Sequence, residues 1–233
     1  MQHNNGKGQI VMKFKTRMSD HGFTITELLL AMGISGIVMG SIYSVYYTQQ
    51  KSHGTQEQVV AMHQNLRVAV YYMQREIRMA GLDPTRSGTA GIATANANSI
   101  RVTLDITDDA GTGTPDGDIG DTAEDITYSL AGSDLMRNDV NGAGNELIAE
   151  NIDVLDFVYL DGAGAVLATP VASPEAIRSV QITLVARTDR EDRGYTNTAA
   201  YANQQATQIL AAQNDRFRRK RLTTQVRCRN LGF

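Results

Sequence analysis

The N-terminal part of the chain contains Gly22-Phe23-Thr24-Ile25-Thr26-Glu27-Leu28-Leu29-Leu30-Ala31, which opens an apolar run that continues to about Tyr47. No charged residue occurs from Leu28 to Tyr47, a span of 20 positions. A helix needs roughly 20 apolar residues to cross the hydrocarbon core of a bilayer. The sequence therefore predicts a helix that can span a membrane.

Glu27 is the carboxylate at the outer end of this apolar run. A charge placed toward the bilayer interior costs on the order of a few kcal/mol unless it finds a partner, so such a residue is read first as functional. A negative charge in the first turn also complements the helix dipole. We therefore expect Glu27 to have a specific partner.

Residues 1–22 are polar and carry four basic residues against one acid, Asp20. Positive charges before an apolar run favour a cytoplasmic leader. An ordinary secretory signal peptide is the alternative, but its apolar region is only about 7–15 residues long and ends at a small-x-small cleavage site. Here a longer run is followed by Lys51-Ser52-His53-Gly54. The apolar segment is therefore expected to remain in the mature protein.

The pattern becomes amphipathic after Thr48. One helical face carries apolar residues at spacings of three and four: Val59, Met62, Leu66, Val70, Met73 and Ile77. Gly81, followed by Pro84, is a typical end for a helix. The sequence predicts one helix of about 58 residues, with its first half in lipid and its second half packed on a domain.

The opening residues, preceded by the basic leader, resemble the processing site of type IV prepilins and pseudopilins. The resemblance implies that a prepilin peptidase/N-methyltransferase cuts after Gly22 and methylates Phe23, and that the apolar helix becomes the filament core. Glu27 would be the acidic residue that takes part in filament assembly. Thr26 departs from the usual apolar residue at its position, but it is small and compatible with a helix.

The rest of the chain is rich in Gly, Ala, Thr, Asn and Asp and predicts a β-rich domain. A turn at residues 161–164 predicts a hairpin, and the polar residues 188–214 predict an insertion that is partly helical around 199–212. Alternating or short apolar runs predict strands at residues 99–107, 126–130, 135–137, 147–149, 154–160, 166–167, 180–186 and 222–229.

Several short patterns resemble PilW-type minor pilins, at residues 75–81, 128–130, 135–137, 157–161, 185–188 and 226–230. The resemblance implies an α+β, pilin-like fold, in which a long N-terminal helix packs on an antiparallel β-sheet domain. The expected parts are a leader at 1–22, a transmembrane or filament-core half-helix at 23–47, an amphipathic half-helix at 48–82, and a periplasmic or extracellular β-rich domain at 83–233.

The inventory of catalytic residue types is poor, so we expect no enzyme, no cofactor and no resident metal. His53 and His63 lie ten residues apart on the helix, and Cys228 is expected to be a small core residue. An acidic loop at residues 108–125 offers oxygen ligands for Ca²⁺, from Asp116, Asp118 and Asp121 with Asp108, Asp109, Glu124 and Asp125. Their spacing does not match an EF-hand loop, so a solvated acidic loop is the expectation.

A basic run occupies residues 216–221, with Phe217 as its aromatic member. It can contact anionic lipid, DNA or an acidic partner, or it can pair with acidic residues of its own domain. We expect the second. Removal of the leader takes the formal net charge from −3 to −6, which argues against general nucleic-acid binding.

The function expected from the resemblance is that of a minor pilin, which primes pilus assembly or sits at the pilus tip, in motility, adhesion or DNA uptake. It would be a single-pass inner-membrane protein with a periplasmic domain before assembly, and would later reach the cell surface. Its partners would be other pilins, the processing peptidase and membrane lipid. Two alternatives stay open: a GspJ-like pseudopilin of a type II secretion system, and a membrane-anchored binding module or hydrolase.

Overall fold

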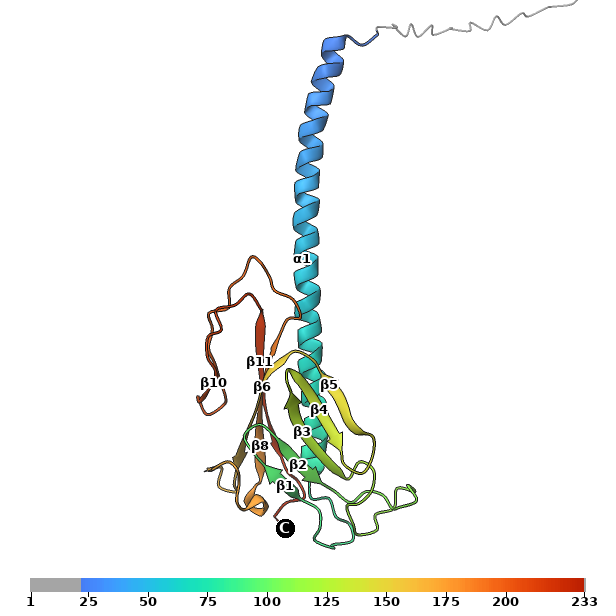
Figure 1. The fold of residues 1–233 in the computed structure, drawn as a ribbon, viewed down its shortest axis with the longest axis vertical. Helices are drawn as coiled ribbons and strands as arrows, with labels where there is room; N and C mark the ends of the chain where they lie inside the picture. Colours follow the sequence, from blue (N-terminus) through green and yellow to red (C-terminus); the bar gives the residue numbers. More distant parts are fainter. Residues whose placement is uncertain (1–21, 233) are drawn as a thin grey trace, which may run out of the picture. The chain divides into compact units, whose positions relative to one another are not determined.

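The computed structural model of the chain describes residues 22–232, so residues 1–21 of the expected leader lie outside the described residues. The chain divides into two compact units at the boundary between Lys51 and Ser52. A single 55-residue helix, α1 (Ile25–Met79), runs through this boundary (Figure 1). Its bounds differ from the predicted helix by one or two residues at each end.

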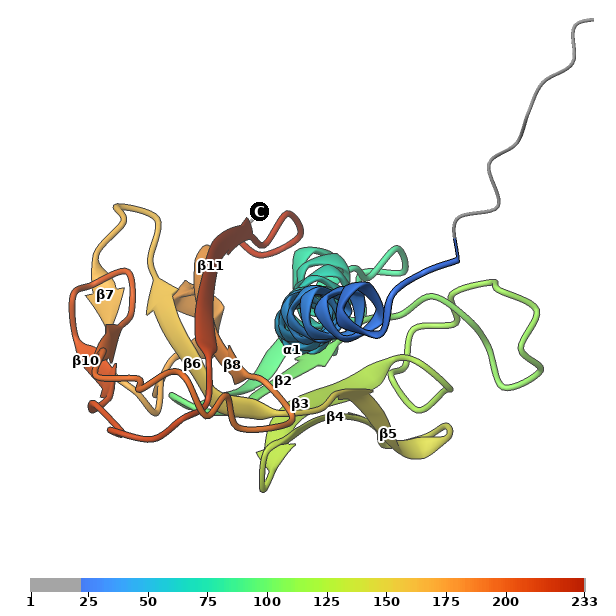
Figure 2. The same cartoon turned by 90° about the horizontal axis from the view of Figure 1, so that it is seen from above.

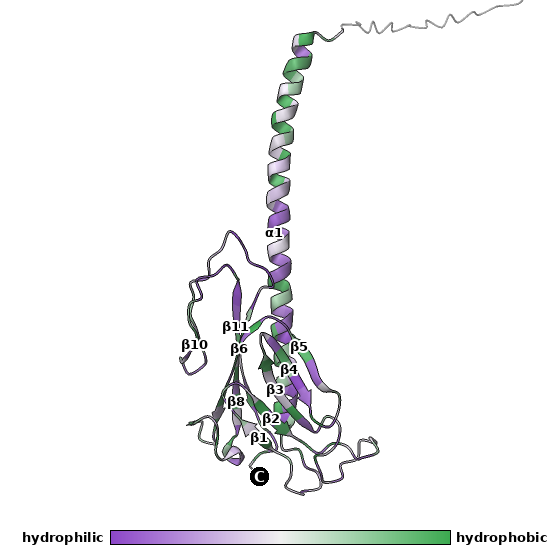
Figure 3. Cartoon of the chain, viewed as in Figure 1, coloured by the Kyte–Doolittle hydropathy of each residue, from purple (hydrophilic) through white to green (hydrophobic). Residues whose placement is uncertain are grey.

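The first unit is the N-terminal half of α1. Every residue from 22 to 51 is exposed, and the large apolar side chains along it are about half to nine-tenths accessible, from Val38 at 49% to Phe23 at 88%. Within the described residues, α1 is the helix that is long and apolar enough to cross a membrane. Figure 3 shows hydrophobic colouring along this half of the helix. Its apolar surface has no packing partner within the described chain.

The second unit combines the rest of α1 with antiparallel sheets. A five-stranded sheet follows chain order, β1-β2-β3-β4-β5, and a four-stranded sheet has the order β11-β8-β6-β7. A two-stranded sheet pairs β10 with β9. The strands are β1 (Ile92–Ala95), β2 (Ile100–Thr103), β3 (Asp125–Ala131), β4 (Asp134–Asp139), β5 (Gly144–Ala149), β6 (Ile152–Leu160), β7 (Val166–Leu167), β8 (Ser179–Arg187), β9 (Tyr201–Ala202), β10 (Gln208–Leu210) and β11 (Arg219–Arg227), with a short 3₁₀ turn, η1 (Pro174–Ala176).

One hydrophobic core joins the C-terminal half of α1 to both large sheets. The helix contributes a buried stripe that includes Leu66 and Met73, and the sheets contribute side chains such as Tyr128, Phe157 and Ile182. The spacing of the helical residues places them on one face, as the sequence predicts. Figure 2 shows this part of α1 next to strands of both sheets. The buried stripe therefore fixes which face of the helix meets the β-domain.

Gly81 ends the helix in the left-handed region, with φ +79°. Its N–H donates to the carbonyl of Thr103 at 3.0 Å, so the first residue after the helical turn is tied to the end of β2. A Cβ atom here would approach Leu231 Cδ2 to 2.5 Å. Both the backbone conformation and the space favour glycine, as predicted for a residue that follows a helix.

Most predicted strands are confirmed within a few residues, and the hairpin of β6 and β7 pairs Tyr159 with Leu167. The predicted strand at 99–107 is too long, because the chain leaves the sheet after Thr103. There the N–H groups of Ile106 and Thr107 donate to the buried carboxylate of Glu124 at 2.7 and 2.8 Å. The short strand β1 was not predicted.

The predicted helical segment around 199–212 is wrong. This segment contains β9 and β10 instead. The side-chain oxygen of Asn203 accepts hydrogen bonds from the N–H groups of Gln205 and Thr207, both at 3.0 Å, and Ala206 has φ +61°. Asparagine offers the backbone an alternative to helical hydrogen bonds, and here it overrides the helix propensity of the Ala- and Gln-rich sequence.

Candidate functional site

Thr24 and Glu27 form reciprocal hydrogen bonds at the start of α1. The N–H of Glu27 donates to Thr24 Oγ1 at 3.2 Å. In return, Glu27 Oε2 accepts from the N–H and the hydroxyl of Thr24, both at 3.2 Å. The carbonyl of Thr24 accepts from the N–H of Leu28 at 3.1 Å. This is a capping box, in which a Thr and a Glu three residues later satisfy two backbone donors at a helix start.

The predicted site residues lie in or next to the capping box. Gly22 and Phe23 immediately precede it and are exposed, as is Glu27. Their predicted roles in cleavage, methylation and assembly stay predictions. The reciprocal bonds between Thr24 and Glu27 were not part of the sequence prediction, although the spacing Thr-x-x-Glu is a readable signal for them.

A buried ionic network attaches the second half of α1 to the five-stranded sheet. Glu76 Oε2 accepts from the hydroxyl of Tyr128 at 2.6 Å, and Glu76 Oε1 accepts from Arg137 Nε at 3.0 Å. Arg137 also donates to Glu146 Oε2 at 3.2 Å. The side chains of Arg137 and Glu76 are 9% and 14% exposed. Burial, together with the nearby carboxylate of Glu76, raises the pKa of Tyr128 above its ordinary value. The network gives the helix one register on the sheet.

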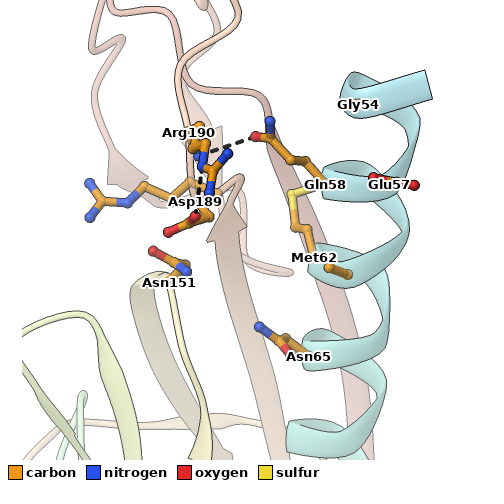
Figure 4. A pocket seen from close by; sticks show the side chains of 10 residues that line it. Gly54, Glu57, Gln58, Met62, Asn65, Asn151, Asp189 and Arg190 are labelled. Atoms are coloured by element: carbon orange, nitrogen blue, oxygen red, sulfur yellow. Dashed lines mark hydrogen bonds and ion pairs between the residues drawn. The ribbon is translucent and has the colours of Figure 1, made fainter. Parts of the chain in front are cut away.

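An open pocket of about 360 Å³ lies between α1 and the chain segment that follows β8. Figure 4 shows Asp189 and Arg190 on one side and Gln58 and Met62 of the helix on the other. The N–H of Arg190 donates to Gln58 Oε1 at 3.1 Å. The arrangement holds this segment against the helix, and it contains no nucleophile with a neighbouring base.

The acidic loop brings the carboxylates of Asp116, Asp118 and Asp121 within 4.8 Å of one another. Two of these carboxylates stabilise the loop itself: Asp116 Oδ1 accepts from the N–H of Asp118 at 3.1 Å, and Asp118 Oδ1 accepts from Gly120 at 2.7 Å. Burial and the negative charges around Asp121 raise the pKa of its carboxyl. The expectation of no resident metal stays a prediction.

The basic run at 216–221 pairs with acids of its own domain, as expected. Arg218 contacts Asp192 at 2.8 Å, and Arg219, whose side chain is 3% exposed, contacts both Asp153 and Asp215. The hydrogen bonds from Arg219 hold the pKa of the Asp215 carboxyl below its ordinary value. The central arginines of the run therefore stabilise the domain.

Cys228 is buried, with 3% of its surface exposed, and lies next to β11. Burial raises the pKa of its thiol to about 12. A thiol in that state is poorly nucleophilic near neutral pH. The prediction that Cys228 is a core residue is confirmed.

Among curated proteins, none matches this sequence. A solved structure, the type IV-like pilin TTHA1219 from Thermus thermophilus, is similar over 73% of this chain and 98% of its own, with a TM-score of 0.49 and 16% sequence identity.

Two family models match different parts of the chain. The prokaryotic N-terminal methylation motif matches residues 17–43, which include Gly22, Phe23 and Glu27. The family described as Type IV Pilus-assembly protein W matches residues 127–230, from β3 to beyond the end of β11. The second match covers a little under half of the chain, and together with the methylation motif it supports a type IV minor pilin of the PilW type.

Proposed function

We propose that this minor pilin is made with a leader at 1–22, is cut between Gly22 and Phe23, and is methylated on Phe23. Before assembly, residues 23–47 would span the inner membrane, with the amphipathic half-helix at 48–82 and the β-rich domain at 83–233 in the periplasm. The subunit would then enter the pilus, where it would prime assembly or occupy the tip. It would act as a structural subunit, not as an enzyme.

The observation that carries this proposal is the position of Glu27. Its carboxylate lies in the first turn of a helix half whose residues are all exposed, inside the segment that matches the methylation motif. An apolar surface of this extent needs lipid or other subunits to cover it. A carboxylate within it then needs a cationic partner.

Cleavage would supply that partner, because it creates a free α-amine at the mature N-terminus of each pilin, which is Phe23 in this chain. In a filament, the amine of a neighbouring subunit can approach Glu27 of this one. Both charges then lose water together, and their attraction and hydrogen bonding offset the desolvation cost. The pair would set the register between subunits, while the apolar helix faces would provide cohesion.

The capping box would orient the carboxylate of Glu27 before it pairs with the amine of a neighbouring subunit. Before assembly, Glu27 Oε2 accepts from Thr24, so the carboxylate is held at the helix start in one orientation. Glu27 Oε1 takes part in neither of these bonds. It is the oxygen that we expect to receive the incoming amine.

The test replaces Glu27 with Ala and measures cleavage and pilus incorporation separately. Cleavage should continue, because the bond after Gly22 is unchanged, whereas incorporation should fall by about tenfold or more for the loss of a desolvated ion pair. Glu57→Ala serves as the control, because Glu57 is an exposed acid on the same helix. Normal incorporation of the Glu27→Ala protein into pili would refute the pairing.

A further inference from the structure

A second group of arginines lines an open groove of about 1140 Å³ at the end of the β-domain that contains the C-terminal segment. Its four members come from three parts of the chain: Arg78 from the last turn of α1, Arg178 from just before β8, and Arg227 and Arg229 from the end of β11 and beyond. We call it the arginine groove.

Backbone hydrogen bonds hold these parts together. The N–H of Cys228 donates to the carbonyl of Arg178 at 3.0 Å, and the N–H of Arg229 donates to the carbonyl of Arg78 at 3.4 Å. Arg227 and Arg229 are exposed, whereas Val226, which precedes Arg227, and Cys228, which lies between the two arginines, are buried. This alternation puts the two arginine side chains on one face of the chain. The groove is therefore built by ordered backbone.

The arginine groove differs from the basic run at 216–221 in its charge balance. Among the residues that the structure describes, no acidic group forms an ion pair with any of the four guanidinium groups. Asp161 is the one acid in the lining, and its Oδ1 accepts from the N–H groups of Ala163 and Ala165 at 2.9 and 2.8 Å. Among the described residues of the lining, four guanidinium groups face one carboxylate, so the groove concentrates positive charge on a protein whose net charge is negative.

Arg178 and Arg227 differ in how their side chains are held. Arg178 is held in place, because its Nη1 donates to the carbonyls of Glu175 and Ile177 at 2.6 and 2.9 Å. Arg227 is exposed at the end of β11. Guanidinium groups bind carboxylates through two parallel hydrogen bonds, which favours an oxyanion ligand.

The lining favours a peptide over a nucleic acid. Leu231, which is partly buried, adds apolar surface next to the arginines, and the described residues of the lining include no aromatic side chain. Single-stranded nucleic acids are held largely by stacking of bases on aromatic side chains. A long polyanion would also meet the acidic remainder of the domain, whereas a short acidic segment is affected mainly by charges within a Debye length of about 10 Å.

We propose that the arginine groove binds an acidic segment of a partner protein, with carboxylates on the guanidinium groups and an apolar side chain against Leu231. That the partner is another pilus component rests on the proposed function. The binding itself can be measured on the purified chain. Its failure would leave the result for Glu27→Ala intact, and a failure of incorporation would leave this binding measurable.

The test uses the mature chain, residues 23–233, in micelles of an uncharged detergent at about 0.1 M salt, where the Debye length is about 10 Å. The probe is a fluorescein-labelled decapeptide of Glu and Asp with two Leu residues. Arg227→Glu/Arg229→Glu should weaken its binding by about tenfold or more, because two charge-assisted contacts are reversed. The matched control is Arg216→Glu/Lys220→Glu, which changes the net charge equally at exposed positions of the basic run. It should change the affinity by less than about threefold.

Two further probes test whether binding requires carboxylates and whether a nucleic acid binds in place of the peptide. A peptide with Gln and Asn in place of Glu and Asp should not bind, and a labelled 20-nucleotide oligothymidylate should bind more weakly than the acidic peptide. Thermal unfolding of each variant checks that the fold is kept. The proposal is overturned if the acidic peptide fails to bind, if both double variants weaken it equally, or if the oligonucleotide is the probe that depends on the groove.

Discussion

The two halves of α1 have similar lengths but different surroundings. Every residue of the N-terminal half, to Lys51, is exposed, whereas the C-terminal half buries Met62, Leu66, Ala69, Met73 and Ile77 in the core of the β-domain. One continuous helix therefore carries a segment whose partners lie within the chain and a segment whose partners lie outside it. A substitution should affect folding in the second segment and assembly in the first.

Loss of Glu76 is expected to have the largest effect on folding. Glu76→Ala would leave the guanidinium of Arg137 and the hydroxyl of Tyr128 buried without their present partner. Removing one member of a buried ionic network costs about 3–5 kcal/mol. The free energy of unfolding, measured by urea denaturation of the chain in micelles, should fall by that amount. Glu57→Ala, at an exposed position of the same helix, should change it by less than about 0.5 kcal/mol.

Two leucines of α1 provide a direct comparison of its halves. Leu66 is 2% exposed and Leu30 is 66% exposed. Leu66→Ala should lower the free energy of unfolding by about 2–5 kcal/mol, because it leaves a cavity in the core. Leu30→Ala should leave the unfolding of the β-domain unchanged within about 0.5 kcal/mol. Equal losses for the two variants would show that the halves do not differ as we describe.

Two glycines, one inside the C-terminal half of α1 and one just after its end, should respond to alanine in opposite directions. Gly81→Ala should destabilise the chain by about 1 kcal/mol or more, because Gly81 has φ +79° and little space beside it. Gly54 lies inside α1, and a Cβ atom there meets nothing within 4 Å. Gly54→Ala should therefore stabilise the chain by up to about 1 kcal/mol through helix propensity. Urea denaturation of both variants measures the sign of each change.

Much of the fold could be predicted from periodicity alone. The spacing of Leu66, Met73 and their neighbours predicted the buried helical face, and most strands followed from short apolar or alternating runs. The segment at 199–212 could not be predicted from composition, because hydrogen bonds that the side chain of Asn203 accepts from backbone N–H groups override the helix propensity of many residues. The early end of β2 likewise depends on Glu124, which is distant in sequence.

Among the site residues, only interactions between residues close in sequence could be predicted. Glu27 could be singled out because an acid beside an apolar run is unusual, and its bonds with Thr24 follow from a spacing of three. The two arginine groups could not be told apart from sequence. Arg219 and Asp153 are 66 residues apart but form an ion pair, whereas Arg227 has no such partner among the described residues. Charge compensation of this kind becomes visible only after the strands are paired.

The central claim is that the exposed half of α1 becomes the mature N-terminus of a pilus subunit. Mass spectrometry of the N-terminal peptide, from the protein isolated with assembled pili, tests this claim most directly. We predict a peptide that begins with N-methylated Phe23 and lacks residues 1–22. A protein that begins at Met1, with its basic leader intact in functional pili, would contradict the account.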